Sequence, residues 1–406
     1  MQTPPITDSD SDRPPPLPYP AVRILEGCLA RGAEAGANEK VLLSNEYGKH
    51  ASVLDLRAAL LSRGYADVES REITLADCGD VLAGVRGEAR DAGAGGRGRE
   101  RLVVVNLCDG TEDDGYPGLS VVTELHRLNL AYTGADPDFY LATTSKPVLK
   151  RMLQARGVPT SPFVEVAPGV TDAELEQLIL SLSHQIGFPL IVKPSVSYAS
   201  LCISDRSVVH TAAECADQCR RVHSETGQGV FVERFLAGRE FTALCTGDAH
   251  QGVKVYTVAE RAFDPALSTY RRILAFDRYW DGFDLNGGAP DPEASSAAPM
   301  YVYRPAPEAW QTHLADVARR AYLACGGSGY GRVDMRTPQD DTWEGVQVLE
   351  VNANCGMSFD VVTSTCGAIL NLANVKPPDF AHSLVLYALR RQQYASPKHI
   401  SGDAEV

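Results

Sequence analysis

Long apolar runs and an excess of basic side chains are both missing from this chain of 406 residues. No segment approaches the roughly 18 consecutive apolar residues of a membrane-spanning helix, so we expect no membrane anchor. The N-terminus lacks the basic and apolar regions of a secretory signal, which predicts a cytoplasmic protein. Acidic residues outnumber basic ones by 52 to 38, for a formal charge of −14. Because nucleic-acid binders are normally basic, we expect no nucleic-acid partner, and any anionic ligand must be held by local cations.

Paired cysteines are also missing, since the ten cysteines are scattered singly. They form no CxxC motif and no cysteine–histidine pair at zinc spacing. Cys215 and Cys219 lie four residues apart and would share a helix face. We expect them to be buried as small apolar side chains and not to bind metal. The pattern is typical of a reduced, intracellular chain.

What the chain does have is most informative between Gly329 and Ser358. Two strand-like runs, Gly331–Met335 and Val346–Asn352, flank a polar connection. This arrangement predicts a β-hairpin.

Four polar side chains of this hairpin are candidates for a site. Because side chains alternate along a strand, Arg332 and Asp334 share one face, as do Glu350 and Asn352. If the two faces align, three oxygen-bearing side chains converge beside a guanidinium. Hard cations such as Mg²⁺ take ligands of this kind, with substrate phosphates completing the shell. The alternative is a hairpin with a solvated carboxylate face.

The N-terminal part of the chain has an α/β pattern. Residues 1–20, rich in Pro, Asp and Ser, predict a disordered tail. The run Val41–Ser44 predicts a short buried strand, and the spacing of apolar residues predicts a helix over Ser52–Arg63. The run Leu102–Leu107 is typical of a strand buried in a parallel sheet. A formal GxGxxG at Gly93, Gly95 and Gly98 precedes this strand, whereas a dinucleotide site must follow one, so we interpret it as a loop.

The middle of the chain adds a lysine at the end of an apolar strand, Leu190–Lys193. Lys193 is either an edge lysine that reaches solvent or a cation that grips phosphate. Residues 262–300 have no regular pattern, which is typical of a functional lid or of disorder. Helical spacing recurs elsewhere and predicts helices over 145–156, 172–185, 211–221, 306–325 and 380–391.

Five segments in order make the chain resemble the ATP-grasp superfamily, and within it the D-alanine–D-alanine ligase branch. The segments are TGADPDFYLATTSK, GFPLIVKPS, VFVERFLAGREFT, GYGRVD and LEVNANCGMS. The resemblance covers most of residues 100–390. It implies an α/β ATP-grasp fold, in which a pre-ATP-grasp domain precedes two α+β subdomains that clasp ATP. The expected bounds are 21–145 for the first domain, 146–237 for the central subdomain, 238–394 for the C-terminal subdomain with a lid at 262–300, and 395–406 for a tail.

The resemblance also implies roles for individual residues. Two lysines, Lys146 and Lys193, would hold ATP phosphates. Glu240 would bind the ribose hydroxyls, and Arg332 would face the transferred phosphoryl group. The adenine would be lined by Glu233, Phe235 and Leu236. The Mg²⁺ ligands would be Asp334, Glu350 and Asn352.

The implied lid would cover the reaction from water. The family lid carries a phosphate-facing lysine that this chain lacks. Arg278 is the preferred replacement, with Arg271 and Arg272 as alternatives.

The implied chemistry is ATP-dependent ligation of a small-molecule carboxylate to an amine, with ATP and Mg²⁺ as cofactors. The carboxylate attacks the γ-phosphate to give an acyl phosphate and ADP. The amine then attacks the acyl carbon and phosphate leaves. A homodimer is left open.

Several positions depart from the family pattern. Residues 197–202 lack the family's glycine, and Cys108-Asp109-Gly110 replaces its histidine loop. Cys355 stands for a proline, and Val361 for the serine that holds the acceptor carboxylate. These changes predict a substrate pair other than two D-alanines, such as one from specialised metabolism. Three alternatives stay open: D-alanine–D-alanine ligase itself, a small-molecule phosphotransferase, and a nucleotide-binding protein without catalysis.

Overall fold

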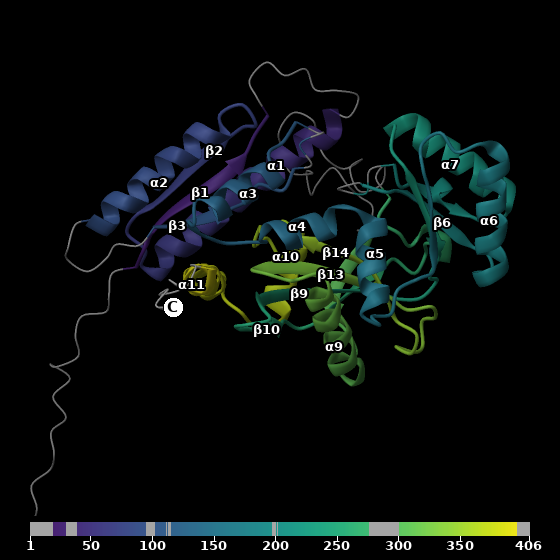
Figure 1. Cartoon of the computed structure of the whole chain (residues 1–406). Coiled ribbons are helices and arrows are strands. Elements are labelled where there is room, and N and C mark those ends of the chain that lie inside the picture. The colour runs from purple at the N-terminus through teal and green to yellow at the C-terminus, as the bar shows by residue number, and fades with distance from the viewer. Residues whose placement is uncertain are drawn as a thin grey trace, which may run out of the picture.

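The computed structural model describes residues 19–29, 39–94, 102–110, 112, 115–196, 200, 202–275 and 300–395. Nearly all of both predicted tails lies outside these ranges. The described residues form a four-stranded parallel sheet, a six-stranded sheet and a four-stranded antiparallel sheet. In Figure 1 the six-stranded sheet lies between the other two sheets.

The N-terminal sheet has the strand order β2-β1-β3-β4. Its strands are β1 (Ala21–Gly27), β2 (Val68–Ile73), β3 (Leu102–Asn106) and β4 (Ala131–Tyr132). Its helices are α1 (Glu39–Arg63), α2 (Cys78–Ala94) and α3 (Leu119–Arg127). Val103, Val104 and Val105 of β3 are all buried, as the continuous apolar run predicted.

Two local predictions in this region were wrong. The strand predicted at Val41–Ser44 lies inside α1. A short apolar run fits a buried strand and a helix equally well, and here the helix extends from Glu39 through both predicted elements. In the rejected GxGxxG motif Gly93 belongs to α2 and not to a loop, whereas Gly95 and Gly98 lie outside the described residues.

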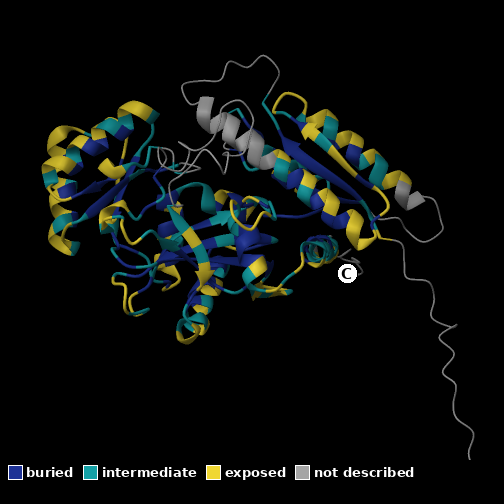
Figure 2. Cartoon of the chain, turned by 180° about the vertical axis from the view of Figure 1, so that it is seen from behind, coloured by how far each residue is buried: buried dark blue, intermediate teal, exposed yellow. Residues whose placement is uncertain are grey.

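The central sheet has the order β5-β8-β6-β7. Its strands are β5 (Phe163–Val166), β6 (Leu190–Pro194), β7 (Val208–Val209) and β8 (Val230–Arg234). One face packs against α6 (Asp172–Ile186) and α7 (Ala212–Thr226), whose outer sides are exposed in Figure 2. Cys215 and Cys219 lie in this cluster, which confirms that they are buried side chains.

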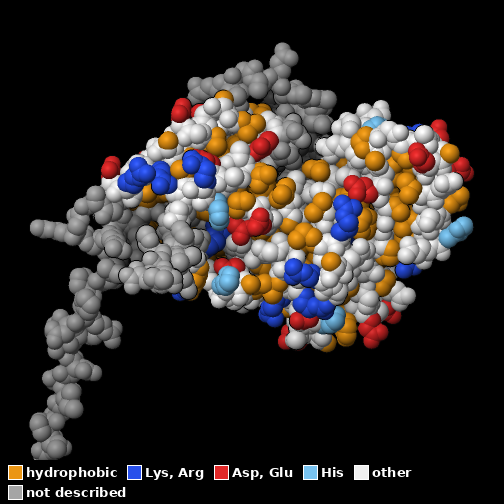
Figure 3. All heavy atoms as spheres, viewed as in Figure 1, with side chains coloured by type: hydrophobic (Ala, Val, Ile, Leu, Met, Phe, Trp, Pro, Cys, Tyr) orange, Lys and Arg blue, Asp and Glu red, His pale blue; other side chains and the backbone are white. Residues whose placement is uncertain are grey.

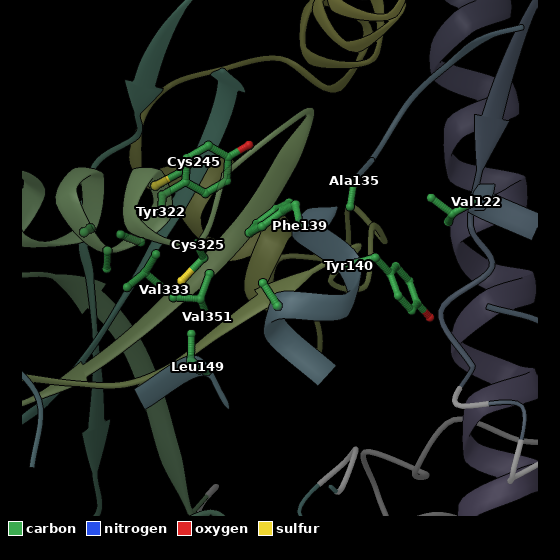
Figure 4. Packing of buried hydrophobic residues seen from close by; sticks show 14 of the residues in the cluster. Val122, Ala135, Phe139, Tyr140, Leu149, Cys245, Tyr322, Cys325, Val333 and Val351 are labelled. Carbon is green, nitrogen blue, oxygen red and sulfur yellow. The ribbon is translucent and has the colours of Figure 1, made fainter. Parts of the chain in front are cut away.

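The six-stranded sheet runs in the order β12-β11-β9-β13-β14, with β10 paired to β9. Its strands are β9 (Glu240–Asp248), β10 (Gly252–Val255), β11 (Ala259–Phe263), β12 (Tyr301–Pro305), β13 (Tyr330–Arg336) and β14 (Gln347–Ala353). The helices on one face are α4 (Pro137–Thr144), α5 (Lys146–Ala155) and α9 (Glu308–Ala324). Figure 4 shows this apolar layer, in which Phe139 and Tyr322 lie close to Val333 and Val351. The other face carries charged side chains and is bordered by α10 (Thr365–Leu372).

The last helix, α11 (Pro377–Ala395), returns to the N-terminal sheet and packs against α1 and β4. Its Phe380 and Leu384 share a buried cluster with Val22 of β1. Each of the three sheets falls within one of the predicted domains, although the exact domain bounds stay a prediction. Among the described helices, none is both long and apolar enough to cross a membrane. On the face shown in Figure 3, acidic and basic side chains are interspersed.

Candidate active site

The charged face of the six-stranded sheet forms the floor of a cavity of about 430 Å³. The cavity is lined from all three parts of the fold. Asp109 and Gly110 come from the N-terminal domain, Lys146 and Lys193 from α5 and β6, and most other lining residues from the six-stranded sheet and the loop that follows β14. A ligand in this cavity would therefore contact segments that are far apart in the sequence.

The predicted hairpin is confirmed, and its register brings the four polar residues together. In the β13–β14 pair, Asp334 lies opposite Glu350 and Arg332 lies opposite Asn352. The Asn352 Nδ2 atom is 3.2 Å from Asp334 Oδ2 and 3.3 Å from Glu350 Oε1. The aligned faces expected from the alternation of side chains are thus present.

Arg332 binds Asp334 through two guanidinium nitrogens, Nε at 3.0 Å and Nη2 at 3.0 Å. Burial raises the pKa of Asp334, but the positive charges of Arg332 and Arg261 lower it more, so its pKa lies below the usual value. Asp334 is therefore ionised at neutral pH and can accept a cation or hydrogen bonds.

Three lysines gather at the edge of the floor nearest β14. Lys146, the first residue of α5, lies 3.8 Å from Glu350. Lys193 lies 2.8 Å from one oxygen of Glu233, and Lys150 lies 2.7 Å from the other. Lys150 was not predicted, although it follows Lys146 by one helical turn. It is completely buried and also donates to the Val348 carbonyl at 2.9 Å.

The charge of this lysine cluster depends on Glu233. Burial raises the pKa of Glu233, but Lys150 and Lys193 lower it more, and the net pKa is lowered. Burial lowers the pKa of Lys193, but Glu233 and Glu350 outweigh this and the net pKa is raised. Lys146 differs, because burial lowers its pKa and the nearby Glu350 does not fully compensate.

The residues predicted to bind adenine and ribose also line the cavity. Phe235 and Leu236 are buried in its wall. Glu240 is engaged on both oxygens, Oε1 by Arg261 and Oε2 by Arg336 at 3.3 Å. An ionised carboxylate has about four acceptor positions, so Glu240 retains capacity for a hydroxyl group.

The three arginines predicted for the lid are Arg271, Arg272 and Arg278, and none of them is found in the cavity lining of the described residues. Arg278 lies outside the described residues. Arg271 forms an ion pair with Asp205 at 2.9 Å, and Arg272 donates to the Leu267 carbonyl at 3.1 Å. Neither of these two arginines lines the cavity, whereas Arg261 of β11, which we did not predict, does.

The positions that depart from the family pattern do not all contact the cavity. Asp109, Gly110 and Cys355 line it. Val361 does not, and half of its side chain is exposed to solvent. Residues 197–199 and 201 lie outside the described ranges.

The described part of the chain thus has three sheets around one cavity, and paired lysines, arginines and carboxylates line that cavity. This arrangement defines the class of fold. The structure is similar to that of a D-alanine–D-alanine ligase from Bacillus anthracis, with a TM-score of 0.58 and 17% identity over 93% of this chain and 99% of that one. The same ligase complexed with ATP matches with a TM-score of 0.58 and 16% identity. These likenesses confirm the predicted ATP-grasp fold.

Sequence comparison then identifies the family. The model of the D-alanine–D-alanine ligase C-terminus matches residues 152–385. A D-alanine–D-alanine ligase of Chromohalobacter salexigens is 30% identical over 307 residues, which are 71% of this chain and 82% of that protein. One from Treponema pallidum is 27% identical over 283 residues, and the match spans 69% of this chain but only 62% of that protein. The chain belongs to the D-alanine–D-alanine ligase family, as its motifs predicted.

Proposed function

We propose that this protein is an ATP-dependent ligase that forms a C–N bond between a small carboxylic acid and an amine through an acyl phosphate. The observation that carries the proposal is the arrangement of the cavity floor. Lys146 lies beside Glu350, Arg332 binds Asp334, and Lys193 lines the same cavity. Phosphoryl transfer requires such positioned cations around the charge of the γ-phosphate.

The same floor fits a Mg²⁺ ion. The Asn352 amide lies within hydrogen-bond distance of both Asp334 and Glu350, and these three side chains carry oxygen atoms of the type that Mg²⁺ prefers as ligands. Within the described ranges, no three Asp, Glu, His or Cys side chains gather as a metal site, so the Asn352 amide oxygen would be the third ligand. When bound, the ion would neutralise charge on the ATP phosphates.

The residues of the chain would supply binding and charge stabilisation. Lys146 and Lys193 would hold the phosphates, and Phe235 and Leu236 would hold the adenine. Arg332 would stabilise the transferred phosphoryl group, and later the oxygen that becomes negative when the amine attacks. The lid predicted over residues 262–300, with Arg278 as its candidate cation, lies mostly outside the described residues.

We further propose that the substrates are not two D-alanines. Val361, at the position of the family serine, lies outside the cavity lining. Tyr301, Tyr303 and Arg261 line the cavity instead, and they suit a partner larger than alanine. The competing function is D-alanine–D-alanine ligase itself, which the family membership favours.

One experiment separates these functions. The protein with Mg-ATP is incubated with D-alanine alone and with a panel of carboxylate–amine pairs, and ADP and products are measured. We expect condensed products from a bulkier pair. Efficient synthesis of D-alanyl-D-alanine would refute the different substrate pair, and a phosphorylated but uncondensed product would show a phosphotransferase.

A further inference from the structure

Arg261 is a buried cation on the cavity wall to which the family chemistry above gives no role. It lies on β11, opposite Glu240 of β9 on one side and Tyr303 of β12 on the other. Its exposed fraction is only 3%, although it lines the cavity. A long, charged side chain is rarely enclosed to this degree unless it is paired.

The pairing of Arg261 is incomplete. Its Nη1 donates to Glu240, and its Nη2 donates to the Tyr303 hydroxyl at 3.2 Å. Its Nε is buried and has no hydrogen-bond partner among the described residues. Nε and Nη2 together form the edge of a guanidinium that binds two oxygens of a carboxylate side by side. Nη2, one end of this edge, is directed at Tyr303 of β12, whereas Nη1 is directed at Glu240 of β9.

The charges around Arg261 favour an anion. Glu240 is shared between Arg261 and Arg336, so two guanidiniums face one carboxylate. Nη2 of Arg336 is likewise buried without a partner in the described part of the chain. Asp334 also lies near Arg261 but is itself bound by Arg332. Three guanidiniums therefore share two carboxylates, and because buried charge is costly unless it is paired, the negative charge of a ligand would offset the excess.

The next groups beyond this edge also suit an anion. The Tyr303 hydroxyl lies 2.6 Å from the Thr365 hydroxyl. Thr365 is the first residue of α10, and both it and its N-cap residue Ser364 line the cavity. The N-terminus of a helix carries partial positive charge and stabilises anions. A guanidinium edge, two hydroxyls and a helix N-terminus therefore lie along one part of the wall.

We propose that Arg261, Tyr303 and Thr365 form a subsite for a carboxylate of a substrate, and that this carboxylate is not the one that reacts. The proposal rests on the ligase function above and adds a residue that determines substrate choice. ATP phosphates share the chemistry of a carboxylate, but position argues against them. Lys146 contacts Glu350 at the β14 edge of the sheet, whereas Arg261 lies on β11, beyond both β13 and β9.

The test compares binding of each amino acid in a panel with binding of its carboxamide. Titrations contain Mg²⁺ and a non-hydrolysable ATP analogue, so they do not require turnover. In the wild-type protein we expect at least one amino acid to bind about 10–100-fold more tightly than its carboxamide, the value of a charged hydrogen-bonded pair. Arg261→Met should remove this difference. Because Arg261 also holds Glu240, the predicted ribose ligand, Tyr303→Phe is the variant that should leave the affinity for the ATP analogue within about twofold.

Two further variants control for effects on folding. Arg261→Lys keeps the charge but loses the two-oxygen edge, and should retain only part of the discrimination. Arg304→Met removes an arginine from the neighbouring strand that pairs with Glu260 and does not line the cavity, and should bind like the wild type. Tyr303→Phe tests the subsite if Arg261→Met does not fold, and should weaken amino-acid binding several-fold.

The outcomes separate this subsite from the ligase function. Equal binding of amino acids and carboxamides by the wild type would overturn the subsite, as would equal binding of amino acids by wild type and Arg261→Met. Loss of ATP-analogue affinity in Tyr303→Phe would show that the subsite serves phosphate and would also overturn it. Carboxylate binding that depends on Arg261, without any ligation product, would uphold the subsite and refute the ligase.

Discussion

Lys150 and Lys193 provide a matched pair for separating stability from nucleotide binding. Each contacts one oxygen of Glu233, at 2.7 Å and 2.8 Å respectively. Lys193 lines the cavity, whereas Lys150 lies beneath it and also holds the Val348 carbonyl. We expect Lys150→Met to reduce stability strongly and Lys193→Met to reduce ATP affinity strongly.

The expected loss of stability follows from the burial of the ion pair, and the expected loss of affinity from the charge of the lysine. Removing one partner of a buried ion pair costs about 3–5 kcal/mol. For Lys150→Met the loss should lie near the lower end of this range, because Lys193 still neutralises Glu233 and Thr160 still donates to Val348 at 3.0 Å. For Lys193→Met we expect a loss of ATP affinity of about 10–100-fold, the value of a charged hydrogen bond to phosphate.

The assay measures urea unfolding and binding of an ATP analogue for both variants. Each variant is the control for the other, because the same mutation is made on either side of one carboxylate. The reasoning would be refuted if Lys150→Met were as stable as the wild type, or if the two variants lost ATP affinity equally. In the second case Lys150 would act on the nucleotide through Glu233 and Lys193.

Three further predictions concern other polar and charged residues. Arg332→Met should lower turnover by about 10²–10³ with little change in the KM for ATP, as for loss of an oxyanion donor, and a change in KM alone would contradict this role. Glu350→Gln and Asn352→Ala should each abolish ADP formation with an unchanged circular dichroism spectrum, and near-wild-type turnover in either would remove the metal site from these positions. Burial raises the pKa of Glu260, but hydrogen bonds from two arginines outweigh this and lower it. Glu260→Gln should therefore cost about 1–3 kcal/mol at pH 7. This difference in urea midpoint should shrink below about pH 4.3, the unfolded pKa, as the wild-type carboxylate becomes protonated, and a pH-independent difference would contradict it.

The sequence predicted those parts of the site that depend on local periodicity. Asp334 and Arg332 share a face because side chains alternate on a strand. The register that places Glu350 opposite Asp334 was only a condition of the prediction, and the pairing shifts register directly after Asp334. Five of the six helices predicted by spacing are present with their ends shifted by a few residues, and the sixth, Ser52–Arg63, is the C-terminal part of α1, which begins at Glu39. The strand predicted at Val41–Ser44 failed because four apolar residues do not distinguish a strand from a helix.

Arg261 shows what local patterns could not provide. Its partners Glu240 and Tyr303 lie 21 and 42 residues away in the sequence. They become neighbours only because β11 inserts between β9 and β12 in the sheet. Strand order is a tertiary property, and no motif in the chain signals it. Arg271 and Arg272, which were predicted from their place in the lid segment, lie near Arg261 in sequence but not in the cavity lining.

The cavity reconciles an acidic chain with an anionic ligand. The protein carries a formal charge of −14, yet each carboxylate at the floor is paired with at least one Lys or Arg: Glu350 with Lys146, Asp334 with Arg332 and Glu240 with Arg261. These pairs lower the cost of burying the cations and hold them at the cavity. If a bound metal ion engaged Asp334 and Glu350, Arg332 and Lys146 would become available to bind phosphate. The carboxylates would then act as counter-ions that the ligands replace. Binding of metal and nucleotide should therefore be coupled through these pairs, because each ligand would meet groups that the other has released.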